Sequence, residues 1–130
     1  MAGITLTDFL GRRMDILGRF PAFPLGTTGA TTVLTIPNVN VGSNKAVITG
    51  LNFDTYTSNS TVFTAQAGQS GATTDWLSSG AITPNFGSGN LFLMAQTSNT
   101  YVPGTAFQVN VTVAGTAAST CLVTVLGFVE

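Results

Sequence analysis

The chain has 130 residues, 44% of them hydrophobic and only 7% charged, with a formal net charge of −1. This length fits one domain with its own core, and the combination of ample hydrophobic residues with low charge is the opposite of a disordered chain. The charge content also excludes a nucleic-acid groove, because binding a phosphate backbone requires clustered Lys and Arg. A surface so poor in charge favours association. We therefore expect a protein that works inside an assembly, with a secreted adhesive β-domain as the alternative.

The residue types needed for common active sites are scarce. The sequence has no histidine, which removes the usual Ser and Cys triads, most zinc sites and the commonest general base near neutral pH. Its one cysteine, Cys121, lies in the apolar run CLVTVLGFV and is predicted to be a buried core residue. No apolar run is long enough to span a membrane and no signal-peptide pattern opens the chain, so we expect synthesis and folding in a cytoplasm.

The only helical pattern lies at residues 5–19. Thr5 and Asp8 form a capping-box-like start, and apolar residues then recur at helical spacing, namely Leu6, Leu10, Met14 and Leu17. Gly11 and Gly18 each weaken a helix by up to about 1 kcal/mol relative to alanine. We therefore expect a marginal helix that needs another surface to lie against.

The backbone preference changes at FPAFP, residues 20–24. The residue before each proline is biased away from the helical region, so we expect an extended segment in which Phe20 and Phe23 project on the same side. The Gly- and Thr-rich stretch at 26–32 then predicts a flexible joint. Residues 1–30 are accordingly predicted to be an N-terminal arm, helical or extended, that includes this joint.

The remainder of the chain, residues 31–130, is predicted to be an all-β domain. Runs with strand character are separated by turn residues, and these runs lie at 31–37, 45–57, 60–68, 75–79, 90–97, 105–115 and 119–130. Strands at this regular spacing favour an antiparallel β-sandwich or jelly-roll domain. The last run is apolar on both faces, so we place it at a central or doubly covered position.

Alternation along a strand predicts which side chains face the core. In the run at 105–115 four side chains are expected to point inward, namely Phe107, Val109, Val111 and Val113. The run at 45–57 is expected to have two faces, with Val47, Leu51 and Phe53 on one and Ile48, Gly50 and Asp54 on the other.

A catalytic site would have to rest on very few residues. Asp54 and Asp75 are candidates for the two carboxylates of a glycosidase, with Trp76 and Tyr56 as sugar platforms. We favour the alternative, in which Asp75 begins a short strand and Asp54 faces solvent or binds a turn. A calcium site is not favoured either, because it normally gathers several carboxylates and each loop offers one. We therefore predict no catalytic residue, no cofactor and no metal site, and we expect the chain not to be an enzyme.

Aromatic residues near the expected loops raise a different class of function. Four of them lie in or near loops or strand ends, namely Trp76, Tyr56, Tyr101 and Phe86. Aromatic rings beside Asn and Gln form platforms for carbohydrates, so an exposed aromatic row would favour sugar binding. The alternative, which we favour, places Trp76 in the core or in a subunit contact.

The layout as a whole resembles a known class of protein. The chain joins a short polar–apolar N-terminal segment and a Gly/Thr-rich joint to a charge-poor, histidine-free domain rich in Thr, Ser, Asn and Gly. In these features it is similar to the decoration, or cement, proteins of tailed bacteriophages. The resemblance covers the whole chain and is one of composition and layout, without a diagnostic motif. It implies a β-sandwich or jelly-roll domain, usually trimeric, that binds the outside of a capsid and bridges neighbouring major capsid protein subunits.

The function predicted from the sequence is therefore that of a virion structural protein that reinforces a capsid. Its partners would be the major capsid protein and further copies of the chain, with a trimer expected, and neither nucleic acid nor a membrane. It would lie on the capsid surface after synthesis in the host cytoplasm. The alternatives are a phage tail or baseplate component and a carbohydrate-binding module.

The N-terminal segment is the predicted attachment element. Arg12, Arg13 and Arg19 would pair with carboxylates of the partner. Phe20 and Phe23 would enter apolar pockets beside them, and this combination of Arg with aromatic residues is typical of binding hot spots. The alternative is that the helix packs across the open sheet of the domain itself.

Overall fold

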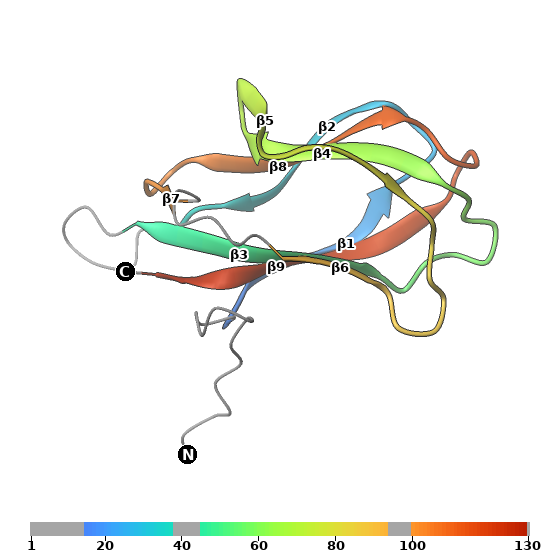
Figure 1. Cartoon of the computed structure of the whole chain (residues 1–130), viewed down its shortest axis with the longest axis horizontal. Coiled ribbons are helices and arrows are strands. Elements are labelled where there is room, and N and C mark those ends of the chain that lie inside the picture. The colour runs from blue at the N-terminus through green and yellow to red at the C-terminus, as the bar shows by residue number, and fades with distance from the viewer. Residues whose placement is uncertain (1–14, 38–44, 94–99, 130) are drawn as a thin grey trace, which may run out of the picture.

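The computed structural model describes residues 15–37, 45–93 and 100–129. These residues form two antiparallel β-sheets that face each other (Figure 1), and they contain no helix. The all-β class predicted from the sequence is thereby confirmed, and the arrangement of the two sheets is that of a β-sandwich.

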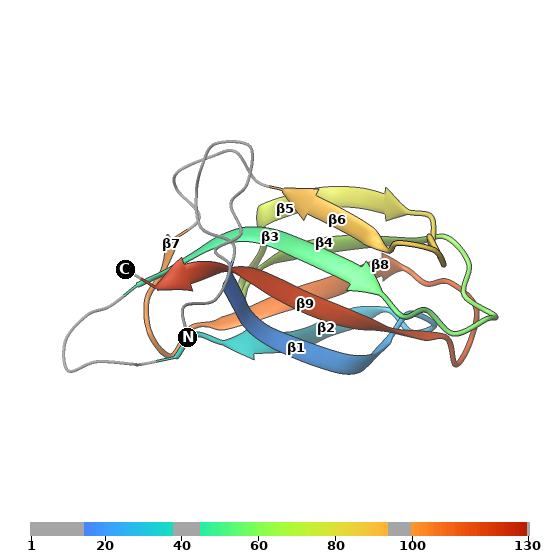
Figure 2. The same ribbon diagram turned by 90° about the horizontal axis from the view of Figure 1, so that it is seen from below.

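The two sheets have five and four strands within the described residues. The order in the first sheet is β1-β9-β3-β6, and β7 also pairs with β3. Its strands are β1 (Asp15–Pro24), β9 (Thr120–Val129), β3 (Ala46–Asp54), β6 (Asn90–Leu93) and β7 (Thr100–Tyr101). The second sheet has the order β2-β8-β4-β5, with β2 (Gly29–Thr35), β8 (Ala106–Val113), β4 (Phe63–Gln69) and β5 (Ala72–Ile82). Figure 2 shows β5 and β6 along one side of the sandwich and β1 and β2 along the opposite side.

The strands pair from the two ends of the chain inward. β1 pairs with β9, β2 with β8, β3 with β6 and β4 with β5, and every pair is antiparallel. Further ladders, β3 with β9 and β4 with β8, join these pairs within each sheet. The first and last strands therefore lie side by side, so the first sheet is complete only when the C-terminal strand is in place.

Aromatic side chains fill the space between the sheets. The ring of Phe53 makes edge-to-face contacts with Phe23 and Phe63, at centroid distances of 6.5 and 5.8 Å. Trp76 is buried, and its indole Nε1 donates a hydrogen bond to a backbone carbonyl of β3 at 3.0 Å. Trp76 therefore lies in the core, one of the two positions favoured from the sequence. The polar atom of its ring is nevertheless paired.

The structure corrects the helix expected at residues 5–19 where that segment overlaps the described residues. Residues 15–19 belong to strand β1 and pair with β9. An edge strand tolerates proline on its free side, which is why Pro21 and Pro24 can lie in β1. Pairing along β9 has thus overridden the helical spacing of the apolar residues. Residues 5–14 of the expected helix lie outside the described residues.

Phe20 and Phe23 lie on the same side of their segment, as predicted, but that side faces the core. The register with β9 shifts between them, and Ala22 within this irregular stretch has a positive φ of 55°. The extra residue places both rings inward, with Phe23 fully buried and Phe20 half-buried. From residue 15 onward, the segment 1–30 that was expected to be an arm therefore belongs to the sandwich, and the domain does not begin at 31.

A bulge at Thr49 changes the faces expected for β3. The register with β9 shifts at this residue, and the extra residue reverses the alternation before it. Ile48 is therefore fully buried in the core cluster, whereas Val47 lies outside that cluster. After the bulge, Leu51 and Phe53 share one face as expected, and both belong to the core cluster.

The predictions for β8 and β9 hold with one exception. Three of the inward side chains expected in β8 are buried, namely Phe107, Val109 and Val111. Val113 is instead 59% exposed, because the register with β4 shifts between Val111 and Val113, and the extra residue pairs Val113 with Thr64, which faces outward. β9 lies between β1 and β3, as its two apolar faces predicted, and Cys121 on this strand is buried.

Candidate functional site

The outward-facing side of the first sheet carries an apolar row that runs across β1, β9, β3 and β6, and Figure 2 shows the order of these strands. Ile16 on β1 is the register partner of Leu126 on β9. On β3, Gly50 is the partner of Leu126 and also of Leu93 on β6. We call these four residues the outer stripe. Ile16 is 52% exposed and Leu93 is 37% exposed, so the two ends of the outer stripe are open to solvent.

A polar row lies beside the outer stripe. Arg19 on β1, Thr124 on β9 and Asn52 on β3 are in register. Arg19 is exposed and makes no hydrogen bond or ion pair with another described residue. Asp54 follows Asn52 by two residues on β3, and its carboxylate accepts a hydrogen bond from the Asn52 amide at 3.3 Å. This face therefore combines an apolar row with one cation and one anion, a composition found in protein–protein interfaces.

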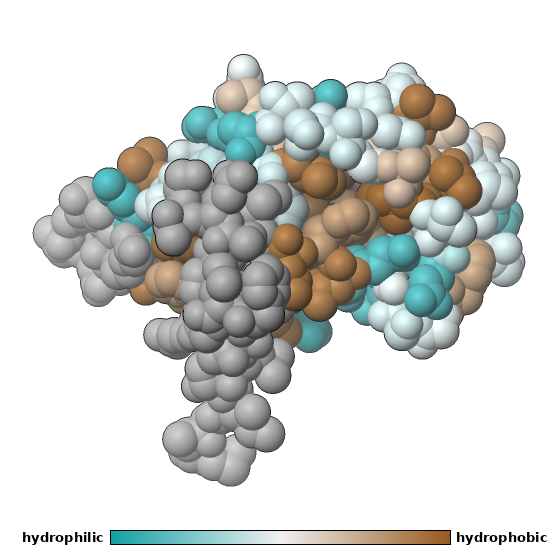
Figure 3. Space-filling model, viewed as in Figure 1, coloured by the Kyte–Doolittle hydropathy of each residue, from teal (hydrophilic) through white to brown (hydrophobic). Residues whose placement is uncertain are grey.

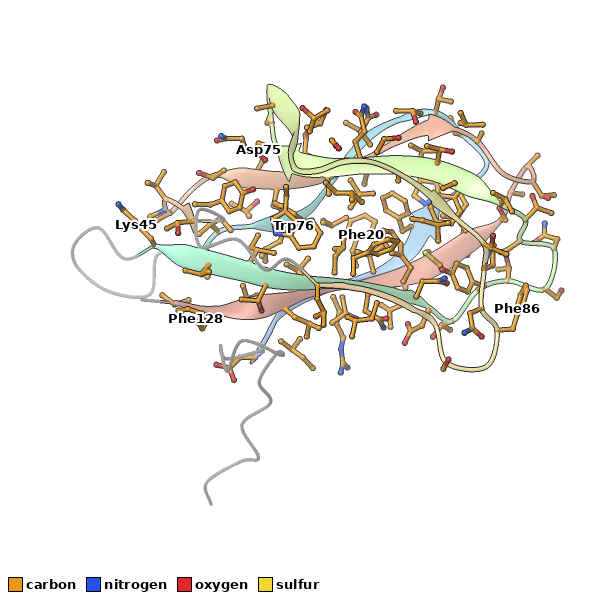
Figure 4. The ribbon with its side chains drawn as sticks, in the orientation of Figure 1. Phe20, Lys45, Asp75, Trp76, Phe86 and Phe128 are labelled. Carbon is orange, nitrogen blue, oxygen red and sulfur yellow. The ribbon has the colours of Figure 1, made fainter. Side chains whose placement is uncertain are left out.

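The structure separates the five residues that were predicted to bind a partner. Arg19 is exposed on the outer side of the first sheet, where it is available to a partner. Figure 4 shows Phe20 between the two sheets, and its ring contacts that of Phe23 at a centroid distance of 6.3 Å. The prediction that Phe23 enters a pocket on a partner is wrong, because its side chain is fully buried in the core of its own chain. Arg12 and Arg13 lie outside the described residues, and their role stays a prediction.

A second surface feature lies at the end of the sandwich far from Lys45 (Figure 4). Phe86, in the loop between β5 and β6, is 58% exposed, and its ring makes an edge contact with Tyr56 at a centroid distance of 5.9 Å. The Tyr56 hydroxyl donates a hydrogen bond to Asn90 Oδ1 at 2.6 Å. Burial, with smaller contributions from Cys121 and then from a nearby carboxylate, raises the pKa of Tyr56 above its ordinary value. Its hydroxyl therefore remains a donor at neutral pH.

The loop that carries Phe86 is held in one conformation by the side chains of two asparagines. Asn85 Oδ1 accepts a hydrogen bond from the backbone N–H two residues later at 3.1 Å, and Asn85 Nδ2 donates to the Ser88 hydroxyl at 3.0 Å. Asn90 Nδ2 donates to the backbone carbonyl that begins the loop at 3.0 Å. Gly89 closes the turn with a φ of 75°. Phe86 is therefore presented on a preorganised support, which lowers the entropic cost of binding through it.

The other aromatic residues that were considered as sugar platforms lie in the core. Trp76 and Tyr101 are buried, and the Tyr101 hydroxyl donates to Asp75 Oδ1 at 3.0 Å. Among the described residues, the exposed aromatic surface at the loops consists of Phe86 resting on Tyr56. An extended aromatic row, the feature that would favour sugar binding, is thus absent from the part of the chain that the structure describes.

The two carboxylates considered as a catalytic pair belong to separate local networks. Asp75, on the second sheet, accepts hydrogen bonds from the Gln69 backbone N–H at 3.2 Å and from its side-chain amide at 2.9 Å. Asp54, on the first sheet, accepts one from the Thr55 hydroxyl at 3.3 Å. The two carboxylates therefore hold turns at different places and do not face a common substrate. In the described ranges no three His, Cys, Asp or Glu side chains gather in a way that could hold a metal ion.

Cys121 is the one thiol of the chain, and it lies in the core. Burial, and to a lesser extent the Asp54 carboxylate, raises the pKa of this thiol to about 12. The thiolate is the form that attacks electrophiles, so at neutral pH Cys121 packs as a small apolar side chain.

Comparison with protein-family models, with curated proteins and with solved structures finds no match to this chain. Among the residues that the structure describes, there is no helix long and apolar enough to cross a membrane. The function is therefore inferred from the fold and from the two surface features, the outer face of the first sheet and the Phe86 loop.

Proposed function

We propose that this chain is a non-enzymatic structural protein of a virion, a capsid decoration protein whose sandwich is a jelly roll. The nested pairing supports the jelly roll, because β1–β9, β2–β8, β3–β6 and β4–β5 pair as they would in a long hairpin wrapped into two sheets. Jelly rolls build viral capsid proteins and also lectins. Since one fold hosts many functions, the architecture narrows the choice and the surface must carry the argument.

The observation that carries the proposal is the composition of the outer face of the first sheet. The outer stripe lies beside Arg19 and Asp54, so an apolar centre is bordered by single charges of opposite sign. Arg12 and Arg13, which were predicted to bind the partner, come shortly before β1 in the sequence. The partner would be the major capsid protein. On a particle that displays many identical sites, contacts that are weak for one copy add up when copies are linked.

This function is tested by cosedimentation of the purified chain with shells of the major capsid protein from the same virus. Ile16→Lys and Arg19→Glu change exposed side chains, so circular dichroism should show an unchanged fold. Each variant is expected to weaken shell binding, because a charge enters the apolar stripe or the charge next to it is reversed. Val113→Lys, at an exposed position on the second sheet, is the matched control and should bind like the natural chain. If the unaltered chain does not sediment with the shells, the proposal is wrong.

A carbohydrate-binding module is the second candidate, and the Phe86 loop is the observation in its favour. A rigid exposed ring beside the polar groups of Asn85 and Ser88 can support one sugar ring. A glycan array would separate the two candidates. Sugar binding that is lost in Phe86→Ala and kept in Arg19→Glu would favour the second candidate, whereas shell binding with the reverse sensitivity would favour the first.

A further inference from the structure

β6 ends the first sheet on the side opposite β1. It pairs with β3 along its whole length, and no described strand pairs with its other edge. On such an edge, N–H and C=O groups of the backbone point away from the sheet and can bind a further strand. β6 is therefore a place at which another chain can extend the sheet.

The three longer edge strands, β1, β2 and β5, carry features that block such pairing. β1 contains Pro21 and Pro24 and two register shifts. β5 and β2 are also irregular, with shifts in their registers with β4 and β8. β6, by contrast, has the sequence NLFL without proline or charge, and its register with β3 is regular. Prolines, bulges and charges are the usual protection of an edge, so β6 is left without it except for its shortness.

The side chains of β6 also favour association. Leu91 and Leu93 point outward and are 52% and 37% exposed, while Phe92 points inward and contacts Phe53 at a centroid distance of 5.9 Å. Figure 3 shows hydrophobic side chains gathered along the middle of the side that β5 and β6 border. The triplet Leu-Phe-Leu reads the same in both directions, so an antiparallel pair of β6 strands would match like side chains with like.

We propose that two copies of this chain associate edge to edge through β6, antiparallel about a two-fold axis centred on Phe92. In this register Leu91 lies directly opposite Leu93 of the partner subunit on the outer face, and each pair removes exposed apolar surface from water. Side chains in such opposite positions lie about 4.5–5.5 Å apart between Cβ atoms. The first sheet would then run without interruption from β1 of one copy to β1 of the other.

The small area of this contact limits the affinity of the dimer. A strand of four residues is roughly 13 Å long at about 3.3 Å per residue, so the interface falls below the ~1,200 Å² that stable complexes bury. We expect a weak, reversible dimer that forms at high protein concentration. Repulsion between like charges does not oppose this dimer, because β6 has no charged residue and the neighbouring β5 has only Asp75.

This inference does not rest on the proposed function, although Leu93 belongs to both surfaces. The dimer forms through the free edge of β6, and the attachment face is tested at Ile16 and Arg19, which lie on β1 at the opposite side of the sheet. A two-fold contact also gives a dimer, whereas the resemblance to decoration proteins implies a trimer. The two ideas can therefore fail separately.

Sedimentation equilibrium over a series of concentrations tests the dimer. The mass of the natural chain should rise from 13.4 kDa toward twice that value as concentration increases. The double variant L91K/L93K should raise the dissociation constant by about tenfold or more, because like charges directly opposite destabilise a strand pair. V113K adds one lysine at a comparably exposed position outside β6 and should dimerise like the natural chain. A chain that stays monomeric up to about 1 mM would overturn the proposal, because any dimer would then have a dissociation constant weaker than about 1 mM. A mass of three times the monomer or unchanged dimerisation of L91K/L93K would overturn it as well.

Disulfide cross-linking tests the register. In the proposed pairing, position 91 of one copy is opposite position 93 of the other and not opposite itself. Mixing L91C with L93C should therefore give an oxidised dimer, and either variant alone should give little. Cys121 is buried and should not contribute to cross-linking. Cross-linking of L91C alone as efficiently as in the mixture would refute the register centred on Phe92.

Discussion

Replacing Phe23 by alanine tests whether residues 20–24 are part of the folded domain or form an arm that projects from it. The side chain is fully buried, its ring contacts those of Phe20 and Phe53, and its backbone pairs with Cys121 on β9. Phe23→Ala therefore removes a ring from the middle of the core. If residues 20–24 projected from the domain as an arm, the same substitution would remove nothing from the core.

The expected loss follows from the burial of the ring. Truncating a buried phenylalanine to alanine costs about 3–5 kcal/mol in the free energy of unfolding. Small domains have about 5–15 kcal/mol in total, so this change removes a large part of the stability. Phe86→Ala is the matched control, because its ring is exposed and its edge contact with Tyr56 is worth only about 0.5–1.5 kcal/mol.

Urea unfolding followed by tryptophan fluorescence measures both variants. The chain has one tryptophan, Trp76, and it is buried between the sheets, so its emission reports the opening of the core. The midpoint for Phe23→Ala should fall well below that of Phe86→Ala, with a similar slope for all three proteins. A difference of less than about 1 kcal/mol between Phe23→Ala and the natural chain would refute the assignment of Phe23 to the core.

Three further predictions follow from the same contacts. Deleting residues 1–24 should abolish the β-sheet signal in circular dichroism because it removes β1, whereas deleting only residues 1–14 should preserve it. Gly89→Ala should lower the free energy of unfolding in urea by about 1 kcal/mol or more, since a β-carbon would meet β3 side-chain and backbone atoms at 2.7 and 2.8 Å and φ is 75°. Stability should also fall at alkaline pH. The folded state keeps Cys121 protonated up to a pKa of about 12 and also raises the pKa of Tyr101, whereas the unfolded chain ionises them near 9.0 and 10.0. The contribution of these two groups to the free energy of unfolding should thus be constant below about pH 9 and then decline by at most about 1.4 kcal/mol per pH unit for each group, as thermal melts at stepped alkaline pH would show.

The strands that could be predicted are those whose signals are local. Alternating side chains and turn residues locate β2 to β6, β8 and β9, because each run carries its own pattern and its own ends. β1 could not be predicted in this way. Its apolar residues continue a spacing of three to four that begins at Leu6 and reaches Leu17, which matches a helix, and only the pairing with β9 makes this segment a strand. The two-residue β7 is too short to carry any pattern.

The surface was harder to predict than the strands, because bulges decide which side of a strand is outside. The bulge at Thr49 moves Ile48 into the core, and the irregularity at Ala22 turns Phe23 inward. Neither is marked by a glycine at the position itself. The exposure of Leu91 could not be predicted for a different reason. Alternation in NLFL indicates that Leu91 and Leu93 share a face, but the exposure of that face depends on β6 being the last strand of the sheet.

The loops of this charge-poor chain are held by hydrogen bonds between neutral groups. Hydroxyl and amide groups tie the loops together there, as in the 2.8 Å contact between the Thr61 and Thr116 hydroxyls and the 3.3 Å hydrogen bond from Asn59 to the Ala117 carbonyl. Such bonds fix a loop without giving it a charge. Copies packed closely together would therefore meet neutral, preorganised surfaces and little like-charge repulsion. Under those conditions a contact as small as the β6 edge contributes, because each neighbour is already held at high effective concentration. A surface of high net charge would oppose this crowding, because neighbouring copies would repel one another.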